Sequence, residues 1–395
     1  MNQATRIFIR EHAEEDVRQL ALRGTKNPEV DLPFALEQIA GRQKARTKLP
    51  GWAAIDGIVY PPHLSMEQCS SEQTAKYKTS LAGKGALVVD LTAGFGVDLA
   101  FISKGFKRAV YVERQPQLCA ISSENFRLLG LQHVKVVCGD GIDYLHQLDH
   151  ADLIFLDPAR RDEHGSRTYG IGDCTPNVLE ILDELLEKAD RVLLKLSPML
   201  DWRKAVADLK YVSEVHIVSV DNECKELLLL LVNGQAQTYT DNVRVACVNL
   251  LSNDGKEVFV SSQNENPRES VLVRCPKYLF EPNASVMKAG CFNEIVGRFP
   301  VIQLDNNSHL FVAETDIEAF PGRRFIIKRT TSMNKRELKD ALAGIDRANI
   351  TVRNFPLPVS ELRKRLKLKD GGEVFIFATT VANEGHKLFI CRKIG

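Results

Sequence analysis

The sequence lacks the features of membrane and secreted proteins. Its 395 residues contain no apolar run near the ~18 residues that a membrane span needs, the longest being Leu227 to Val232. Its first residues contain no apolar core of signal-peptide length. Nine cysteines, an odd number without a Cys-x-x-Cys pair, favour neither a disulfide framework nor a structural zinc site. We therefore expect a cytoplasmic protein without a metal or a membrane contact.

Net charge is also almost absent, but the charges are divided unevenly. The formal net charge is +1. From Arg323 onward, 17 Lys and Arg stand against 7 Asp and Glu, whereas the preceding residues hold 35 against 44. The length predicts two or three domains. An acidic body followed by a basic part indicates a different partner for each.

The first residues, to about position 80, are expected to be helical. Glu11–Arg23 and Phe34–Arg46 place apolar residues at helical spacing, and a third helix should begin near Ser70 or Ser71. A cap by one of these serines is the favoured interpretation of that segment. From Ala86 onward, short apolar runs alternate with helical stretches, which predicts a parallel sheet covered on both faces. The expected strands are Leu87–Leu91, Ala109–Glu113, Val134–Cys138, Asp152–Asp157, Arg191–Leu196, Val215–Val220 and Leu227–Val232.

Two connections in this region carry specific expectations. A crossover helix should span Thr175 to Ala189, with Thr175 as its cap and an apolar stripe that includes Val178 and Leu185. The last two strands are separated by Asp221–Glu226, too few residues for a parallel crossover. They must form a hairpin, which places one antiparallel strand in the sheet. Lys225 and Glu226, in that hairpin, are interpreted as surface charges.

The remaining residues predict smaller mixed units. Val243–Leu250 and Glu257–Ser261 should form a hairpin around Asn253-Asp254-Gly255. A small α+β unit should follow at the end of the chain. Its expected elements are the helices Asn334–Leu342 and Ser360–Leu368 and the strands Ile350–Val352, Val374–Thr379 and Lys387–Arg392.

A glycine-containing turn follows the first expected strand, in the segment Asp90-Leu-Thr-Ala-Gly94-Phe-Gly96. Two glycines allow the backbone to approach a ligand at the carboxyl edge of the sheet, although a tight turn without a ligand explains them equally well. Leu99 occupies the third glycine position of the dinucleotide fingerprint and excludes that motif.

Carboxylates at the ends of the next two strands help to identify the ligand. Glu113 ends the second strand, near the ~20-residue distance at which an acidic side chain reaches ribose hydroxyls. Asp140 follows the third strand and could accept from an adenine amino group. No Lys or Arg lies beside the glycines to bind a phosphate. This pattern favours S-adenosylmethionine over NAD or ATP.

These residues resemble the class I S-adenosylmethionine-dependent methyltransferases, over roughly residues 80 to 235. In that family the glycine turn holds the methionine and ribose parts, the acidic residue after strand two takes the ribose hydroxyls, and the third carboxylate faces the adenine amine. The resemblance implies an α/β fold with a Rossmann-like seven-stranded sheet that ends in an antiparallel strand. The implied cofactor-binding residues are Asp90, Thr92, Ala93, Gly94, Gly96, Glu113, Arg114, Asp140 and Gly141.

The loop after the fourth strand, Leu156-Asp157-Pro158-Ala159-Arg160-Arg161, is similar to the Asp-Pro-Pro-aromatic loop of amino-group methyltransferases. Asp157 and Pro158 match it and are the expected catalytic residues. Ala159 and Arg160 depart from it, so a base would have to stack on Tyr169 or Trp202, or the target is not a planar base. A proline turn with surface arginines is the other interpretation.

Carbon-directed RNA methyltransferases use a cysteine nucleophile in the loops after strand four or five to activate the pyrimidine ring. The segment Lys195-Leu-Ser-Pro198 contains none, and Cys174 lies far along the chain from Asp157. An amine needs positioning and proton removal, which Asp157 or solvent can supply. We therefore favour nitrogen over carbon.

The basic C-terminal unit resembles the THUMP-like domain at the end of some bacterial methyltransferases, and the region around Tyr278 to Gly290 resembles their ferredoxin-like insert. True THUMP domains bind RNA in tRNA-modifying enzymes, so the resemblance implies RNA; a solvated helix face is the other interpretation of the charges. The segment Glu67–Lys76 is more weakly similar to the helix that lines the cofactor pocket of trimethylguanosine synthase. The expected RNA-binding residues are Arg329, Lys335, Arg336, Arg363, Lys364, Arg365 and Lys367.

The sequence thus predicts a methyltransferase that acts on a nitrogen of an RNA base, in tRNA or rRNA. A methyltransferase of proteins or small molecules, and a non-catalytic RNA-binding protein with a methyltransferase-like core, are the alternatives. The expected domains are a helical extension (1–80), the cofactor-binding domain (81–240), a β-rich, ferredoxin-like linker region (241–325) and the basic THUMP-like domain (326–395).

Overall fold

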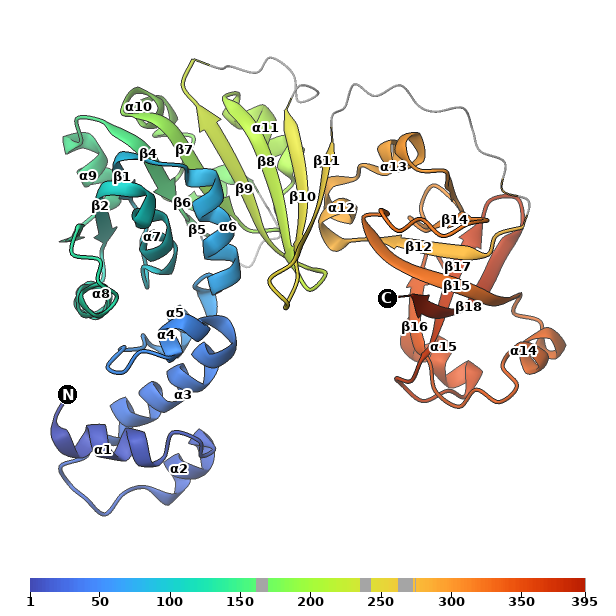
Figure 1. Cartoon of the computed structure of the whole chain (residues 1–395), viewed down its shortest axis with the longest axis horizontal. Coiled ribbons are helices and arrows are strands. Elements are labelled where there is room, and N and C mark those ends of the chain that lie inside the picture. Colours follow the sequence, from blue (N-terminus) through green and yellow to red (C-terminus); the bar gives the residue numbers. More distant parts are fainter. Residues whose placement is uncertain (161–169, 235–242, 262–272, 274, 395) are drawn as a thin grey trace. The chain divides into compact units, whose positions relative to one another are not determined.

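The computed structural model describes residues 1–160, 170–234, 243–261, 273 and 275–394 (Figure 1). The chain divides into two compact units. The first consists of Met1–Val215 and Glu226–Val243, and the second of His216–Lys225 and Arg244–Gly395. Among the described residues, no helix combines the length and the hydropathy that crossing a membrane requires.

Helices dominate the start of the chain: α1 (Gln3–Glu11), α2 (Val17–Arg23), α3 (Leu32–Lys48), α4 (Pro50–Ala53), α5 (His63–Gln68) and α6 (Glu72–Ala82). The expected continuous helix Glu11–Arg23 is wrong. The Asp16 carboxylate accepts hydrogen bonds from the amides of Arg18 and Gln19, and so caps a new helix there. Ser71 caps α6 by accepting from the Thr74 amide.

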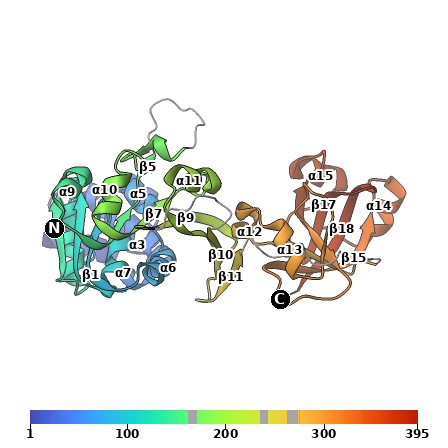
Figure 2. The same cartoon turned by 90° about the horizontal axis from the view of Figure 1, so that it is seen from above.

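A central sheet follows, whose strand order among the described residues is β11-β10-β8-β9-β7-β4-β1-β2-β3. In Figure 2, α6 and α7 (Val97–Ile102) lie on one side of this sheet, and α9 (Gly141–Gln147) and α10 (Leu182–Glu187) lie on the other. The remaining helices of this region are α8 (Pro116–Leu128) and α11 (Trp202–Leu209). The strands are β1 (Gly85–Asp90), β2 (Phe106–Glu113), β3 (Val134–Cys138), β4 (Ala151–Leu156), β7 (Ala189–Leu196), β8 (Val212–Val220), β9 (Glu223–Val232), β10 (Arg244–Leu250) and β11 (Lys256–Ser261).

The expected antiparallel strand is confirmed. The strands β1 to β4 and β7 pair in parallel, whereas β9 runs antiparallel to β7. Asp221 and Asn222, which join β8 to β9, have φ values of 47° and 66°. A two-residue turn with two positive φ angles matches the twist of a hairpin, and Asp and Asn tolerate that conformation. The hairpin of β10 and β11 is confirmed as well.

The crossover helix expected over Thr175 to Ala189 is only partly right. α10 covers Leu182–Glu187, whereas Cys174–Thr175 forms the short strand β6, which pairs with β5 (Ala159–Arg160). Thr175 therefore extends a two-stranded ladder instead of capping a helix. The predicted apolar residues are nevertheless buried: Val178, Ile181, Leu182, Leu185 and Leu186.

The second unit contains a separate sheet, with the order β13-β14-β12-β15-β18-β17-β16 in its described part. Alternate residues of its strands enter different cores. Ile376 and Ile390 pack with Leu362 on one face, whereas Phe377 and Phe389 pack on the other. Its strands are β12 (Tyr278–Pro282), β13 (Ile302–Gln303), β14 (Phe311–Ala313), β15 (Gly322–Thr331), β16 (Asn349–Arg353), β17 (Val374–Val381) and β18 (Gly385–Ile394). Its helices include α12 (Ala284–Ala289), α13 (Phe292–Arg298), α14 (Lys335–Ala341) and α15 (Val359–Leu366).

Candidate active site

The glycine turn lies between β1 and α7, and its two glycines are required for different reasons. Gly94 and Gly96 have φ values of +54° and +80°, which L side chains rarely adopt. A Cβ on Gly96 would lie 2.8 Å from Cζ of Phe126. A Cβ on Gly94 would have no atom of the described residues within 4 Å. Gly96 therefore serves packing, whereas Gly94 presents its backbone to open space where a ligand can approach.

Side chains of β2 hold this turn in place. The Glu113 carboxylate accepts hydrogen bonds from the Gly94 amide at 3.0 Å and from the Gln115 amide at 2.9 Å. The Tyr111 hydroxyl donates to the Gly94 carbonyl. Glu113 thus lies directly beside the turn, as a ribose-binding carboxylate must.

The third predicted carboxylate begins α9. Asp140 accepts hydrogen bonds from the amides of Ile142 and Asp143 and pairs with Arg114 at 2.6 Å. A Cβ on Gly141 would lie 2.1 Å from the Leu91 carbonyl oxygen, so this helix approaches the glycine turn closely. The structure therefore brings the predicted cofactor residues of β1, β2 and β3 to one edge of the sheet.

Asp90 and Thr92 connect this edge to the next loop. Asp90 is buried and accepts from the Thr92 amide at 3.0 Å. Burial raises the pKa of Asp90 well above its ordinary value, and the charges of Asp98 and Asp157 add to this effect. The Thr92 hydroxyl oxygen accepts from the Asp157 amide at 2.6 Å. The glycine turn and the predicted catalytic loop are thus joined by one hydroxyl.

Asp157 forms a close ion pair with Lys195, the last but one residue of β7. Their Oδ2 and Nζ atoms are 2.5 Å apart, and the Asp157 side chain remains 38% exposed. Burial raises the pKa of Asp157, and Lys195 opposes that shift. Burial works against the Lys195 cation, but Asp157, Asp98 and Glu226 together raise the pKa of Lys195 above its ordinary value. The pair therefore presents a fixed carboxylate with a cation behind it.

A second lysine lies deeper in the same cluster. Lys78, on α6, is fully buried; its Nζ lies 3.1 Å from Oδ1 of Asp98 and 2.5 Å from Oε2 of Glu226. The Ser70 hydroxyl donates to Asp98 at 2.7 Å. Burial would raise the pKa of Asp98, but the two lysines outweigh it and hold that pKa below its ordinary value. We call Lys78, Asp98, Asp157, Lys195 and Glu226 the buried ion cluster.

This cluster corrects one sequence expectation. Glu226 is 4% exposed and belongs to the cluster, so its interpretation as a surface charge is wrong. Lys225 does lie on the surface, where it pairs with Glu223. The available signal was the position of Glu226 directly before the apolar run that enters the sheet. For Lys78 the available signal was weaker: it lies three residues after Ala75 and four before Ala82, on the buried face of α6.

Of the two residues that the sequence suggested for base stacking, the structure describes only Trp202. Trp202 is 2% exposed, and the Arg203 guanidinium lies 4.4 Å from its ring centre, so the ring is not open to a substrate. Tyr169 lies outside the described residues. Cys174, set aside for its distance along the chain, pairs through its backbone with Arg160, close to the Asp157-Pro158 loop. Its side chain is buried.

The predicted RNA-binding cations of the second unit fall into two groups. Arg363 donates to the Ala348 carbonyl and pairs with Asp370, and Arg329 donates to the Asp340 carbonyl, so both are held by the fold. α15 turns Leu362 into the core and its cations outward. The exposed members of the set are Arg329, Lys335, Arg336, Lys364, Arg365 and Lys367, whereas Arg363 is half-buried.

Comparisons with known families cover most of the chain. The model of the THUMP domain-like family matches residues 322–393, and that of a ferredoxin-like domain matches residues 278–321. The family described as conserved hypothetical protein 95 matches residues 73–168.

Relatives extend over nearly the whole length. The crystal structure of a candidate methyltransferase from Porphyromonas gingivalis W83 is 32% identical, with a TM-score of 0.88 over 99% of this chain and 98% of that chain. An uncharacterized S-adenosylmethionine-dependent methyltransferase of Mycobacterium tuberculosis is 24% identical over 320 residues, 80% of this chain and 83% of its own. The chain belongs to the S-adenosylmethionine-dependent methyltransferases. A shorter part of this methyltransferase is similar to ribosomal RNA small subunit methyltransferase J of Legionella pneumophila. The two are 29% identical over 91 residues, which cover 21% of this chain and 37% of that protein.

Family membership confirms the fold class, the enzyme class, the cofactor and the THUMP-like domain expected from the sequence. The residues of this methyltransferase fit S-adenosylmethionine. Gly94 leaves room for close approach, and the carboxylates of Glu113 and Asp140 suit ribose hydroxyls and an adenine amine. The alternative of a non-catalytic core is therefore set aside.

Proposed function

We propose that this methyltransferase modifies RNA, either tRNA or rRNA. The observation that carries the proposal is the exposed cations of α14 and α15 on a THUMP-like domain, because clustered cations suit a phosphate backbone. The match to a ribosomal RNA methyltransferase supports it.

All nine cysteines are free, which supports a reducing, cytoplasmic location.

The cofactor would be held at the carboxyl edge of β1, β2 and β3. Glu113 would bind the ribose, Asp140 the adenine and the turn around Gly94 the methionine part; Asp90, Thr92, Ala93, Gly96, Arg114 and Gly141 support these contacts. S-adenosylmethionine supplies an electrophilic methyl group there. The protein's own task is to present an acceptor beside the Asp157-Pro158 loop with its lone pair in line.

A nitrogen acceptor agrees with the state of Asp157. The carboxylate is paired with Lys195, so it is a fixed hydrogen-bond acceptor that can orient an amino group through its N–H. The proton released after methyl transfer passes to solvent or to this carboxylate.

A hydroxyl acceptor, such as a ribose 2′-hydroxyl, is the second candidate. The same ion pair favours it, because Asp157 can accept the hydroxyl proton. Lys195, whose Nζ lies 2.5 Å from Oδ2 of Asp157, would then stabilise the developing negative charge on the substrate oxygen. It would also need no stacking on Trp202, whose ring is buried.

The deciding experiment is transfer of labelled methyl groups to total RNA from a strain that lacks the gene, with total protein as the parallel substrate. We expect label in RNA, and at least a ~100-fold slower transfer by Asp157→Asn. Mass spectrometry of the digested nucleosides then separates base methylation from ribose methylation. Label in protein alone would overturn the RNA proposal.

A further inference from the structure

A β-bulge interrupts β15 within the THUMP-like domain. Ile327 pairs with Cys391 of β18, but the next paired residue is Arg329, opposite Ile390, so Lys328 is the extra residue. In a regular strand Lys328 and Arg329 would point to opposite faces. Both residues line one cavity beside the bulge.

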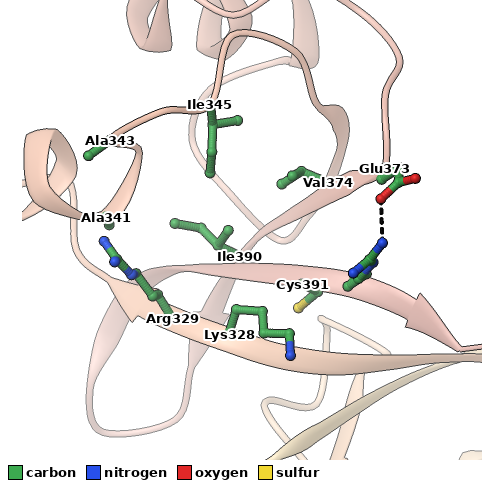
Figure 3. A pocket seen from close by; sticks show the side chains of 10 residues that line it. Lys328, Arg329, Ala341, Ala343, Ile345, Glu373, Val374, Ile390 and Cys391 are labelled. Carbon is green, nitrogen blue, oxygen red and sulfur yellow. Dashed lines mark hydrogen bonds and ion pairs between the residues drawn. The ribbon is translucent and has the colours of Figure 1, made fainter.

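The cavity has a volume of about 350 Å³. Figure 3 shows Lys328, Arg329 and Ile390 on the strand side of the cavity and Ile345 and Val374 across from them. Arg392 adds a third cation, paired at 2.5 Å with Glu373, the acidic residue among those described around the cavity. The remaining lining is small or apolar: Ala341, Ala343 and Cys391.

This combination points to a ligand with an anionic part and a flat apolar part. Arg329 is held by the Asp340 carbonyl and Arg392 by Glu373, so both guanidinium groups are already oriented. Lys328 is exposed and lines the same cavity. A phosphate can bind the cations, whereas a ring can lie against the aliphatic side chains of Ile345 and Val374, which are only partly buried.

We propose that this cavity binds one unpaired nucleotide of the RNA, with its phosphate on Lys328 and Arg392 and its base against the aliphatic wall. The proposal rests on the RNA function proposed above. A base inside a duplex cannot present its face to such a wall, whereas a single-stranded segment can. Glu373 can accept from the exocyclic amine of a base that has one.

The test uses the full chain and a labelled hexauridylate, compared with a labelled RNA duplex. We expect Lys328→Ala to weaken binding of the hexamer by about tenfold and binding of the duplex by less than twofold. Lys335→Ala removes an exposed cation of α14 that does not line the cavity, and should weaken both ligands alike. Val374→Trp fills the cavity without changing charge and should weaken the hexamer selectively.

The outcomes are distinct from those of the RNA proposal. If wild type methylates RNA but Lys328→Ala and Val374→Trp bind the hexamer as wild type does, the cavity proposal is wrong and the function stands. If the variants lose hexamer binding while wild type methylates no RNA, the cavity stands and the function fails. An equal loss for hexamer and duplex would mean that Lys328 acts only as a general charge.

Discussion

Asp157 is the residue on which the proposed chemistry depends, and the Lys195 cation opposes the effect of burial on its pKa. Their ion pair lies at the partly exposed end of the buried ion cluster, since the Asp157 side chain is 38% exposed whereas Lys78 is fully buried. Because burial raises the pKa of Asp157 and Lys195 opposes the shift, removing the cation should raise that pKa further.

Lys195→Met should therefore shift the pH dependence of methyl transfer. The ionised form of Asp157 would be populated only at higher pH, so the acid limb of kcat/KM should move upward and activity should partly recover as pH rises. Lys195→Arg keeps the cation and should leave the limb in place. A uniform loss of activity at every pH would contradict this role.

The two glycines of the turn should respond differently to the same small change. Gly94→Ala should lower the free energy of unfolding by about 1 kcal/mol, because Gly94 has a positive φ. It should also weaken cofactor binding, because the new methyl group enters the open space beside the turn. Gly96→Ala adds a collision with Phe126 and should be destabilised further, by about 1–3 kcal/mol. Urea unfolding and calorimetry with S-adenosylmethionine separate the two effects; equal behaviour would refute the distinction.

At the scale of helices and strands, the sequence predicted what local periodicity and spacing control. The strands of the first sheet and the antiparallel β9 follow from apolar runs and from the short link between Val220 and Leu227. The break at Asp16 and the ladder at Cys174–Thr175 did not follow, because each depends on a side-chain cap or a pairing partner elsewhere. The buried ion cluster was not predicted for the same reason, since its five charged residues come from segments that are far apart in the sequence.

The buried ion cluster should hold α6, α7 and β9 together. Lys78→Met would leave Asp98 and Glu226 with too little positive charge and should lower the free energy of unfolding by about 3–5 kcal/mol. Lys76→Met, on the exposed side of the same helix, should cost less than about 1 kcal/mol. Denaturant unfolding measures both, and similar small losses would show that the cluster adds no stability.

At the scale of the whole molecule, the uneven charge has a structural counterpart. The sequence-predicted carboxylates gather at the sheet edge of the first unit, whereas the exposed cations of α14 and α15 belong to the second. The predicted set required one refinement: Arg363 is half-buried and paired with Asp370, whereas the other six residues remain exposed.

The combined variant Lys364→Ala, Arg365→Ala and Lys367→Ala should therefore change RNA binding through salt dependence. The negative slope of log K against log salt should become shallower by about 2, since each of the three lost phosphate contacts contributes ~0.7 for single strands. Affinity for S-adenosylmethionine should stay unchanged. An unaltered slope would place the RNA contacts on other residues.

The way the chain divides restricts how the molecule can be taken apart. His216–Lys225 belongs to the second unit, although it lies inside the span of the first. A cut at a single peptide bond therefore cannot release two complete halves, and removing everything after residue 243 would strip β10 from β8 and expose an edge strand. The second unit is thus not an appendage joined to the first by one crossing of the chain. Expressing either span alone would leave out residues that complete its unit.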